Sequence, residues 1–201
     1  ERSAIDEEIW TIVRASAHTV IKRWREPDNG IWERRGPLQH YVHSKMMSWV
    51  AIDRAAKIAI FIGKEPYAVT WRREADVIKN DVLTHGWSER AQSFAMYYGS
   101  DELDAANLLM LHYGFLPQTD PRIVNTVRSS YAKLTRDGFT FRYVCEDEFG
   151  APTSAFIVCT FWMINALYLI GEHVLARAML NNVLATTNQF GLLAEDIDIA
   201  T

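Results

Sequence analysis

Glu33 and its neighbours are the part of this sequence best suited to chemistry. Glu33 follows Trp32 within residues 27–36, a segment rich in turn-forming residues. A Trp ring offers a flat apolar face to a sugar ring. It also lowers the local polarity, which favours the protonated, proton-donating form of a nearby carboxyl group. A carboxylate beside a Trp, in a loop between two helical segments, is therefore typical of a site that cuts glycosidic bonds.

The elements that must position this loop are expected to be almost all helical. Apolar residues recur at helical spacing along most of the sequence, and Gly or Pro residues separate these stretches. Short extended stretches are expected at residues 94–99 and 138–143. Asp101 is a candidate N-cap for the helix that begins near residue 103. The pattern predicts about seven helices, at residues 3–25, 43–62, 67–84, 103–112, 121–135, 154–170 and 172–187.

The composition is ordinary for a globular protein and excludes several classes of function. The 201 residues are 49% hydrophobic and 23% charged. A formal net charge of −4 and the absence of a basic run argue against a nucleic-acid partner. No run of about eighteen apolar residues is present, so no membrane partner is expected. Cys145 and Cys159 form no metal motif, and we favour free thiols over a disulfide between them.

The ends and the interior of the sequence bear on its organisation. The chain begins at Glu1 and shows no basic segment followed by an apolar stretch. We therefore expect a piece of a longer protein, with a cytoplasmic location. No low-complexity or Pro/Gly-rich linker divides the sequence, so residues 1–201 are expected to form part of one catalytic domain without an internal boundary.

Four separated segments, taken together, resemble glycoside hydrolase family 15, which contains glucoamylases, glucodextranases and one class of trehalases. The first extends over residues 28–55 and includes the sequences DNGIWERRG and HSKMMSWVAIDRA. The other three are GSDELDAANLLM from Gly99, FRYVCEDEFGAPTSAFIVCTFW from Phe141 and NQFGLLAEDID from Asn188. The resemblance covers residues 28–198, and the four segments agree with the family in order and spacing.

This resemblance implies an all-α fold, the (α/α)6 barrel, in which twelve helices form two concentric rings. In the family the acid loop follows the fifth helix and the base loop follows the eleventh. The chain is then an incomplete barrel, the fifth to eleventh helices of twelve. Such a piece leaves apolar faces uncovered. We expect it to be unstable alone, and we expect the remainder of the barrel or a second copy to cover these faces.

The resemblance also implies hydrolysis with inversion, which needs one carboxyl group as acid and another as base, roughly 6.5–9.5 Å apart. It assigns the general acid to Glu33 and the general base to Glu195, with Asp196 as the second choice for the base. The alternative for Glu33 and Glu195 is a carboxylate that merely faces solvent. This chemistry needs no cofactor and no metal, so none is expected.

Five further residues are expected to contact the substrate, namely Trp32, Arg35, Lys45, Asp101 and Asp104. Trp32 is a candidate platform for a sugar ring, or it packs within its loop. Arg35 and Lys45 are suited to sugar hydroxyls, and their alternatives are an exposed ion pair and a solvated lysine. Asp101 and Asp104 lie in a segment that faces the sugar pocket in the family. Helix capping is the competing role for both aspartates.

The expected function is therefore the release of glucose from an α-linked oligosaccharide or disaccharide. Glucoamylase-like action on malto-oligosaccharides is the first interpretation, and trehalase action competes closely with it. The segments DNGIWE and SKMMSW resemble the prokaryotic members, among which both activities occur. The chain has Arg34 where fungal glucoamylases typically have a second acidic residue, so their subsite rules do not transfer. The alternatives of another class are a non-catalytic helical scaffold and an inactive fragment.

Overall fold

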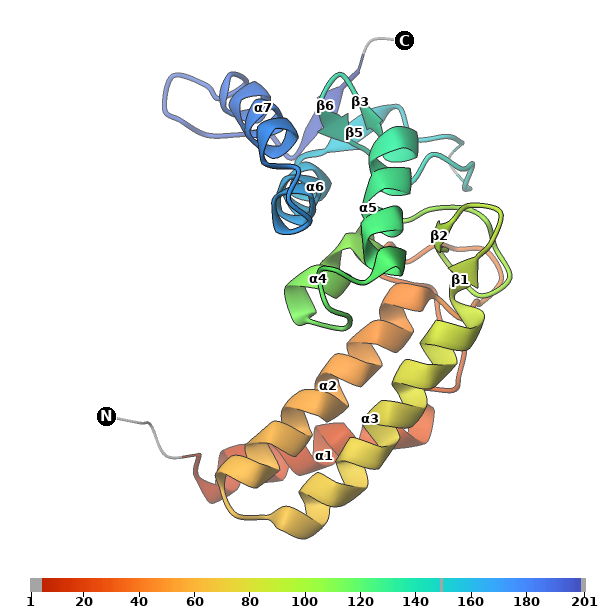
Figure 1. Ribbon diagram of the computed structural model, residues 1–201, viewed down its shortest axis with the longest axis vertical. Helices are drawn as coiled ribbons and strands as arrows, with labels where there is room; N and C mark the ends of the chain where they lie inside the picture. The colour runs from red at the N-terminus through yellow and green to blue at the C-terminus, as the bar shows by residue number, and fades with distance from the viewer. Residues whose placement is uncertain (1–4, 149, 200–201) are drawn as a thin grey trace.

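The computed structural model describes residues 5–148 and 150–199, and most of these residues are helical (Figure 1). Seven α-helices in the described residues match the expected number. They are α1 (Glu7–Arg23), α2 (Val42–Phe61), α3 (Glu65–His85), α4 (Leu109–Tyr113), α5 (Pro121–Leu134), α6 (Ile157–Leu169) and α7 (His173–Leu184). A short 3-10 helix, η1 (Ala105–Leu108), precedes α4 and completes the segment that was expected to be one helix.

The helices begin and end at residues suited to those positions. Asp6 caps α1 by accepting a hydrogen bond from the amide of Ile9 at 2.8 Å. Asp120 caps α5 in the same way through the amide of Arg122, and Pro121 occupies the first turn. Gly63 connects α2 to α3 with a φ of 71°, a conformation that few other residues adopt readily. These local signals explain why the helix boundaries could be predicted closely.

Three two-stranded antiparallel sheets lie between the helices. They pair β1 (Trp87–Ser88) with β2 (Ser93–Phe94), β3 (Thr135–Arg136) with β4 (Phe139–Thr140), and β5 (Ser154–Phe156) with β6 (Asp196–Asp198). The expectation that the sixth helix begins at residue 154 is wrong by three residues. Ser154–Phe156 is a strand because it pairs with a segment about forty positions later, which local periodicity does not reveal.

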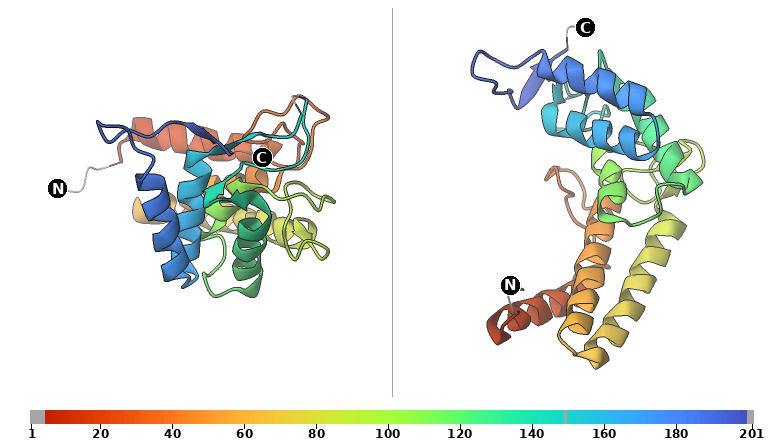
Figure 2. Two further views of the ribbon diagram at one scale, coloured as in Figure 1. Left: turned by 90° about the horizontal axis from the view of Figure 1, so that it is seen from above. Right: turned by 60° about the vertical axis from the view of Figure 1, so that its left-hand side comes forward.

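Helix α2 forms the centre of the first half of the molecule. It packs against both α1 and α3, and Ile52, Ala56 and Ala59 are fully buried along it. The small alanine side chains allow the neighbouring helices to approach closely. Helices α1–α3 lie at one end of the molecule and α6 and α7 at the other, with α4 and α5 between them (Figure 2). No helix in the described part of the chain is long and apolar enough to cross a membrane.

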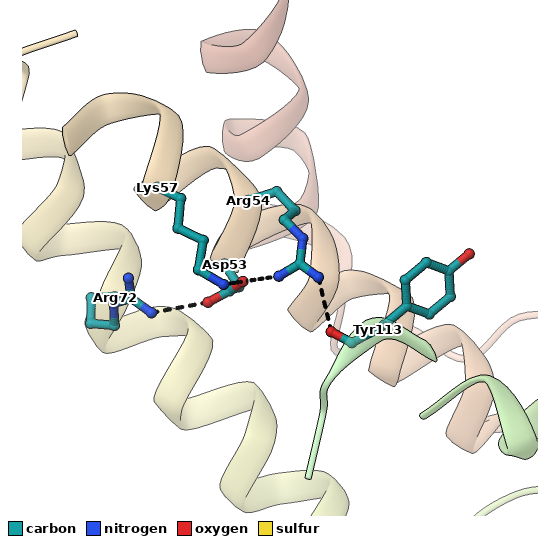
Figure 3. Close-up of polar contacts among 5 residues, drawn as sticks. All are labelled: Asp53, Arg54, Lys57, Arg72 and Tyr113. Carbon is teal, nitrogen blue, oxygen red and sulfur yellow. Dashed lines mark hydrogen bonds and ion pairs between the residues drawn. The ribbon is translucent and has the colours of Figure 1, made fainter. Parts of the chain in front are cut away.

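A buried carboxylate joins three of these helices (Figure 3). Asp53 of α2 is 3% exposed and pairs with Arg54, with Lys57 at 2.7 Å and with Arg72 of α3 at 2.9 Å. Arg54 also donates to the carbonyl of Tyr113 at the end of α4, at 2.9 Å. Burial alone raises the pKa of Asp53, but hydrogen bonds and positive charge from Lys57 and Arg54 outweigh it and hold the pKa below its ordinary value. Lys57 and Arg54 thus favour the ionised form of Asp53.

Helices α6 and α7 pack against each other but present apolar side chains to solvent on their other faces. Tyr168 is 57% exposed and Val174 is 87% exposed, and a groove of about 500 Å³ opens between the two helices beside Phe161 and Leu180. Soluble monomers seldom leave such surfaces open. The expectation that the remainder of a barrel or a second copy covers these faces stays a prediction.

Candidate active site

The loop that carries Glu33 is closed at its base by a pair of backbone hydrogen bonds. Asp28 and Gln39 exchange them at 2.9 and 3.0 Å, so the chain leaves and returns at one point. Gly30 has a φ of 70°, and a Cβ atom there would lie 2.9 Å from the Tyr41 ring. Glu33 itself has a φ of 51°, a conformation that is uncommon for residues other than glycine and is found at functional sites. Its side chain is exposed.

Trp32 is held in place from several directions. Its indole nitrogen donates to Oδ1 of Asp104 at 2.9 Å. Its ring lies 6.0 Å from that of Phe156 and 6.1 Å from that of Trp162. These contacts support a packing role for one part of the half-buried ring. The expected role of Trp32 as a platform for a sugar ring applies to the accessible part of the ring, and this role stays a prediction.

Asp104 is fixed in the wall behind Trp32. It is 2% exposed and also accepts a hydrogen bond from the amide of Ala106 at 2.8 Å, which makes it the N-cap of η1. Burial raises the pKa of this carboxyl group to about 6, against the opposing effect of the hydrogen bonds that it accepts. The capping role considered for Asp104 is thus confirmed, and its expected contact with substrate stays a prediction.

Asp101 does not cap the helix, so that competing interpretation is wrong. The cap is Asp104, three residues later. The carboxylate of Asp101 instead accepts hydrogen bonds from the hydroxyl of Ser88 and, at 2.5 Å, from Nε of Arg90. The hydrogen bonds from Ser88 and Arg90 keep its pKa below the ordinary value. Asp101 is thus tied to the β1–β2 hairpin, and its expected contact with substrate stays a prediction.

Arg35 and Lys45 have different surroundings. The amide of Arg35 donates to Oε1 of Glu148 at 3.0 Å, and its side chain is exposed. Lys45 is 2% exposed, and its ammonium group donates to the carbonyls of Trp24 at 2.6 Å and Glu26 at 2.5 Å. A solvated lysine is therefore excluded. Burial lowers the pKa of Lys45, although nearby carboxylates partly oppose this effect.

Glu195 lies directly before β6, in a segment held mainly by backbone contacts. Its carbonyl accepts a hydrogen bond from the amide of Ile157 at 2.9 Å, and its side chain is exposed. The next residue, Asp196, pairs in register with Phe156 of β5. Phe156 also packs on Trp32, as described above. The segments of the expected acid and the expected base, far apart in sequence, therefore share Phe156 as a neighbour.

Comparison with known proteins identifies the family to which this arrangement belongs. A model of the glycosyl hydrolases family 15 matches residues 1–196. The chain belongs to glycosyl hydrolases family 15. The resemblance found in the sequence is thereby confirmed over nearly the whole chain.

Relatives within family 15 include proteins named trehalase. The chain is 41% identical over 200 residues to a trehalase of Mycobacterium tuberculosis and 40% identical over 203 residues to one of Mycolicibacterium smegmatis. These alignments cover 98% and 100% of this chain but 29% and 30% of the relatives. The chain therefore spans less than a third of the length of these two relatives.

Solved structures confirm the fold expected for family 15. The structure of a bacterial glucoamylase complexed with acarbose superposes with a TM-score of 0.75 over 94% of this chain and 33% of that chain, at 16% identity. The fold class, an incomplete (α/α)6 barrel, is thus confirmed. At this identity the likeness establishes the fold alone.

Arg142 is a candidate site residue of this family 15 chain that the sequence did not single out. Its guanidinium lies 5.8 Å from the ring of Trp32, 5.9 Å from that of Tyr143 and 5.7 Å from that of Phe156. Among the residues that the structure describes, it makes no ion pair. A guanidinium held between aromatic faces, with its N–H groups not committed to a carboxylate, is suited to hydroxyl acceptors. The sequence feature that could have drawn attention to Arg142 is its position just before an acidic stretch.

Arg34, noted in the sequence only as a departure from fungal members, ties the Glu33 loop to residues 143–147. Its guanidinium donates to the carbonyl of Glu146 at 2.9 Å and lies 5.3 Å from the Tyr143 ring. It also approaches the sulfur atoms of Met96 and Cys145. An acidic residue at this position could not donate to that carbonyl, so the contact explains what arginine contributes here.

Proposed function

We propose that the full-length protein is an inverting α-glucosidase that hydrolyses trehalose. The reaction class follows from membership of glycosyl hydrolases family 15. The substrate is supported by relatives named trehalase at 41% and 40% identity. The observation that carries the site assignment is the shared neighbour Phe156, which contacts the ring next to Glu33 and pairs with the residue next to Glu195.

The proposed mechanism is a single displacement with two carboxyl groups. Glu33 protonates the glycosidic oxygen as the bond to the anomeric carbon breaks. Glu195 takes a proton from a water molecule that attacks the same carbon from the opposite face. The released glucose then carries the inverted, β configuration at this carbon. Such a reaction is complete without a cofactor, because proton transfer and positioning lower the barrier.

The surrounding residues have complementary roles in this proposal. Trp32 offers the accessible part of its ring to the sugar at the cleavage point, and Arg142, next to the same ring, donates to the sugar hydroxyls. Arg35 and Asp101 are further candidates for hydroxyl contacts. Asp104 supports the site by fixing the Trp32 indole. Glu33 has a left-handed backbone conformation, and its side chain is exposed and so accessible to a substrate.

Glucoamylase-like action on malto-oligosaccharides is the second candidate. The structural likeness to a glucoamylase complexed with acarbose favours it as far as the barrel is concerned. The two substrates differ on the far side of the scissile oxygen, which is bonded to a second anomeric carbon in trehalose and to C4 of the next sugar in maltose. Residues beyond the first sugar therefore decide between them.

The deciding experiment measures glucose release by the full-length protein from trehalose, maltose and maltotetraose, beside its Glu33→Gln variant. We expect release from trehalose, lowered by roughly 10²–10⁴-fold in the variant because the general acid is lost. Proton NMR during the first turnovers should detect β-glucose. Preference for maltotetraose would transfer the proposal to the glucoamylase-like reaction. A folded protein without release from any of the three would overturn it.

A further inference from the structure

Lys45 has an unusual environment for a lysine in a carbohydrate-active protein. Its ammonium group lies inside the protein and donates to the carbonyls of Trp24 and Glu26 at 2.6 and 2.5 Å. With 2% of the residue exposed, little of the side chain can meet a substrate. The burial of a charged group is costly unless hydrogen bonds replace its hydration.

The two acceptors explain why the buried group is a cation. Trp24 is the C-cap of α1, where the last carbonyls of a helix lack intrahelical partners. The helix dipole places partial negative charge at this end, and an ammonium group there is stabilising. Lys45 belongs to the first turn of α2, so it caps a helix other than its own. It thereby fixes the end of α1 to the beginning of α2.

The neighbouring residue of α2 binds the other side of the same junction. The hydroxyl of Ser44 donates to Oδ1 of Asp28 at 2.8 Å, and the same oxygen accepts the amide of Gly30 at 2.7 Å. Ser44 and Lys45, which we call the loop clamp, therefore hold the chain on both sides of Pro27 by hydrogen bonds. Lys45 binds the residues before it, and Ser44 binds Asp28 after it. From Asp28 the chain reaches Glu33 within five residues, through a turn at Gly30 that packs against Tyr41.

We propose that Lys45, together with Ser44, positions the acid loop, and that it acts on catalysis through Glu33 without contacting the sugar. This inference rests on the proposed role of Glu33 as general acid. A short loop closed by Asp28 and Gln39 has few internal degrees of freedom, so a shift at the clamp is transmitted to its tip. A misplacement of about 1 Å in a catalytic group can cost about 100-fold in rate.

The test uses two substrates that differ in their need for an acid. Trehalose requires protonation of the leaving oxygen, whereas fluoride leaves from α-D-glucosyl fluoride without it. In the full-length protein we expect Lys45→Met to lower kcat on trehalose about 100-fold, with KM changed less than about threefold and with the rate on glucosyl fluoride nearly retained. The control is Lys22→Met, an exposed lysine in the last turn of α1, which should leave both rates unchanged.

Ser44→Ala provides a milder test if Lys45→Met does not fold. It removes one hydrogen bond of the clamp and should reduce only the trehalose rate, by a smaller factor. Equal losses on both substrates in a folded Lys45→Met or Ser44→Ala protein would overturn the proposal, because they exclude an effect through the acid. A raised KM with unchanged kcat in Lys45→Met would instead make the lysine a sugar contact and would also overturn it.

The failure of this inference can be told apart from the failure of the proposed function. Glu33→Gln serves as the reference, since loss of the acid itself must produce the same dependence on the leaving group. If Glu33→Gln keeps its activity on trehalose, the proposed function fails, whatever Lys45 does. If Glu33→Gln shows the dependence and neither clamp variant does, only the positioning role fails.

Discussion

The segments of the two candidate catalytic carboxylates are built in different ways. The Glu33 loop is fixed by side chains from distant parts of the chain, namely Ser44, Lys45 and Asp104. The segment before β6 is fixed by backbone pairing with β5 and by a local turn in which Asn188 accepts the amides of Phe190 and Leu192. The Glu33 loop is thus held by side chains from several elements, whereas the segment before β6 is held by backbone pairing and one local turn.

The two segments also differ in exposure. Phe190 is 76% exposed and Leu192 is 63% exposed, just before Glu195, while Trp32 next to Glu33 is half-buried. Large apolar side chains beside a catalytic group normally shield it from water. The expectation that the remainder of a barrel or a second copy covers exposed apolar side chains therefore extends to the base segment, and it stays a prediction.

The largest expected effect separates the acid from the base. In the full-length protein, Glu195→Gln should lower the rates on trehalose and on α-D-glucosyl fluoride alike, by roughly 10²–10⁴-fold, because both reactions need an activated water. Glu33→Gln should lower only the rate on trehalose. Steady-state rates on the two substrates measure this contrast. If Glu195→Gln retained activity and Asp196→Asn lost it, Asp196 would be the general base.

An intermediate effect concerns the wall of the acid loop at Asp104. Its pKa of about 6 lies above the ordinary value of 3.8, so the native state holds this proton more tightly than the unfolded state does. The contribution of protonated Asp104 to the stability of the native state is therefore complete below about pH 4, and it is lost as the pH rises towards 6. A pKa difference of about 2 corresponds to roughly 3 kcal/mol.

The test at Asp104 compares the wild type with Asp104→Asn, whose amide oxygen can still accept from Trp32 and Ala106 but does not titrate. The free energy of unfolding, measured between pH 4 and 7, should fall more steeply in the wild type. Asp104→Ala, which leaves the Trp32 indole without its acceptor, should be less stable than either at pH 7. Parallel pH profiles for wild type and Asp104→Asn would contradict the raised pKa.

The smallest expected effect tests the neighbour of the base segment. In the full-length protein, Leu192→Ser should lower the unfolding free energy by more than the roughly 0.5 kcal/mol typical of a solvent-exposed site. The reason is that we expect another part of that protein to cover this side chain, which is 63% exposed in the 201 residues. Thermal unfolding of the full-length wild type and variant makes the comparison. A change below about 0.5 kcal/mol would show that nothing covers this segment.

The helices could be predicted from the sequence because their signals are local. Apolar periodicity, Asp caps and Gly or Pro breaks lie within or beside the helices, and the main error was to place β5, together with Thr135 of β3, in a helix. The acid and base segments were found through family resemblance, and their meeting at Phe156 requires strand pairing between residues 154–156 and 196–198. No local pattern contains that pairing.

The roles of single polar residues were the hardest to predict. Lys45 and Asp104 look alike in sequence as polar residues near helix starts, and both were expected at the sugar. Their partners, the end of α1 and the indole of Trp32, come from other elements. Arg142 lies near the rings of Trp32 and Phe156, which are distant from it in the sequence. Only the folded chain brings these rings together.

The network around Asp53 has a consequence for behaviour on heating. Three cations share one buried carboxylate, and they connect α2 to α3 and to the end of α4 (Figure 3). As temperature rises, the hydration of charged groups becomes less favourable, so the cost of keeping Asp53 out of water decreases. The contribution of this network therefore grows under conditions in which other contacts weaken. We expect the α2–α3 hairpin to be the part of the chain that loses its structure last.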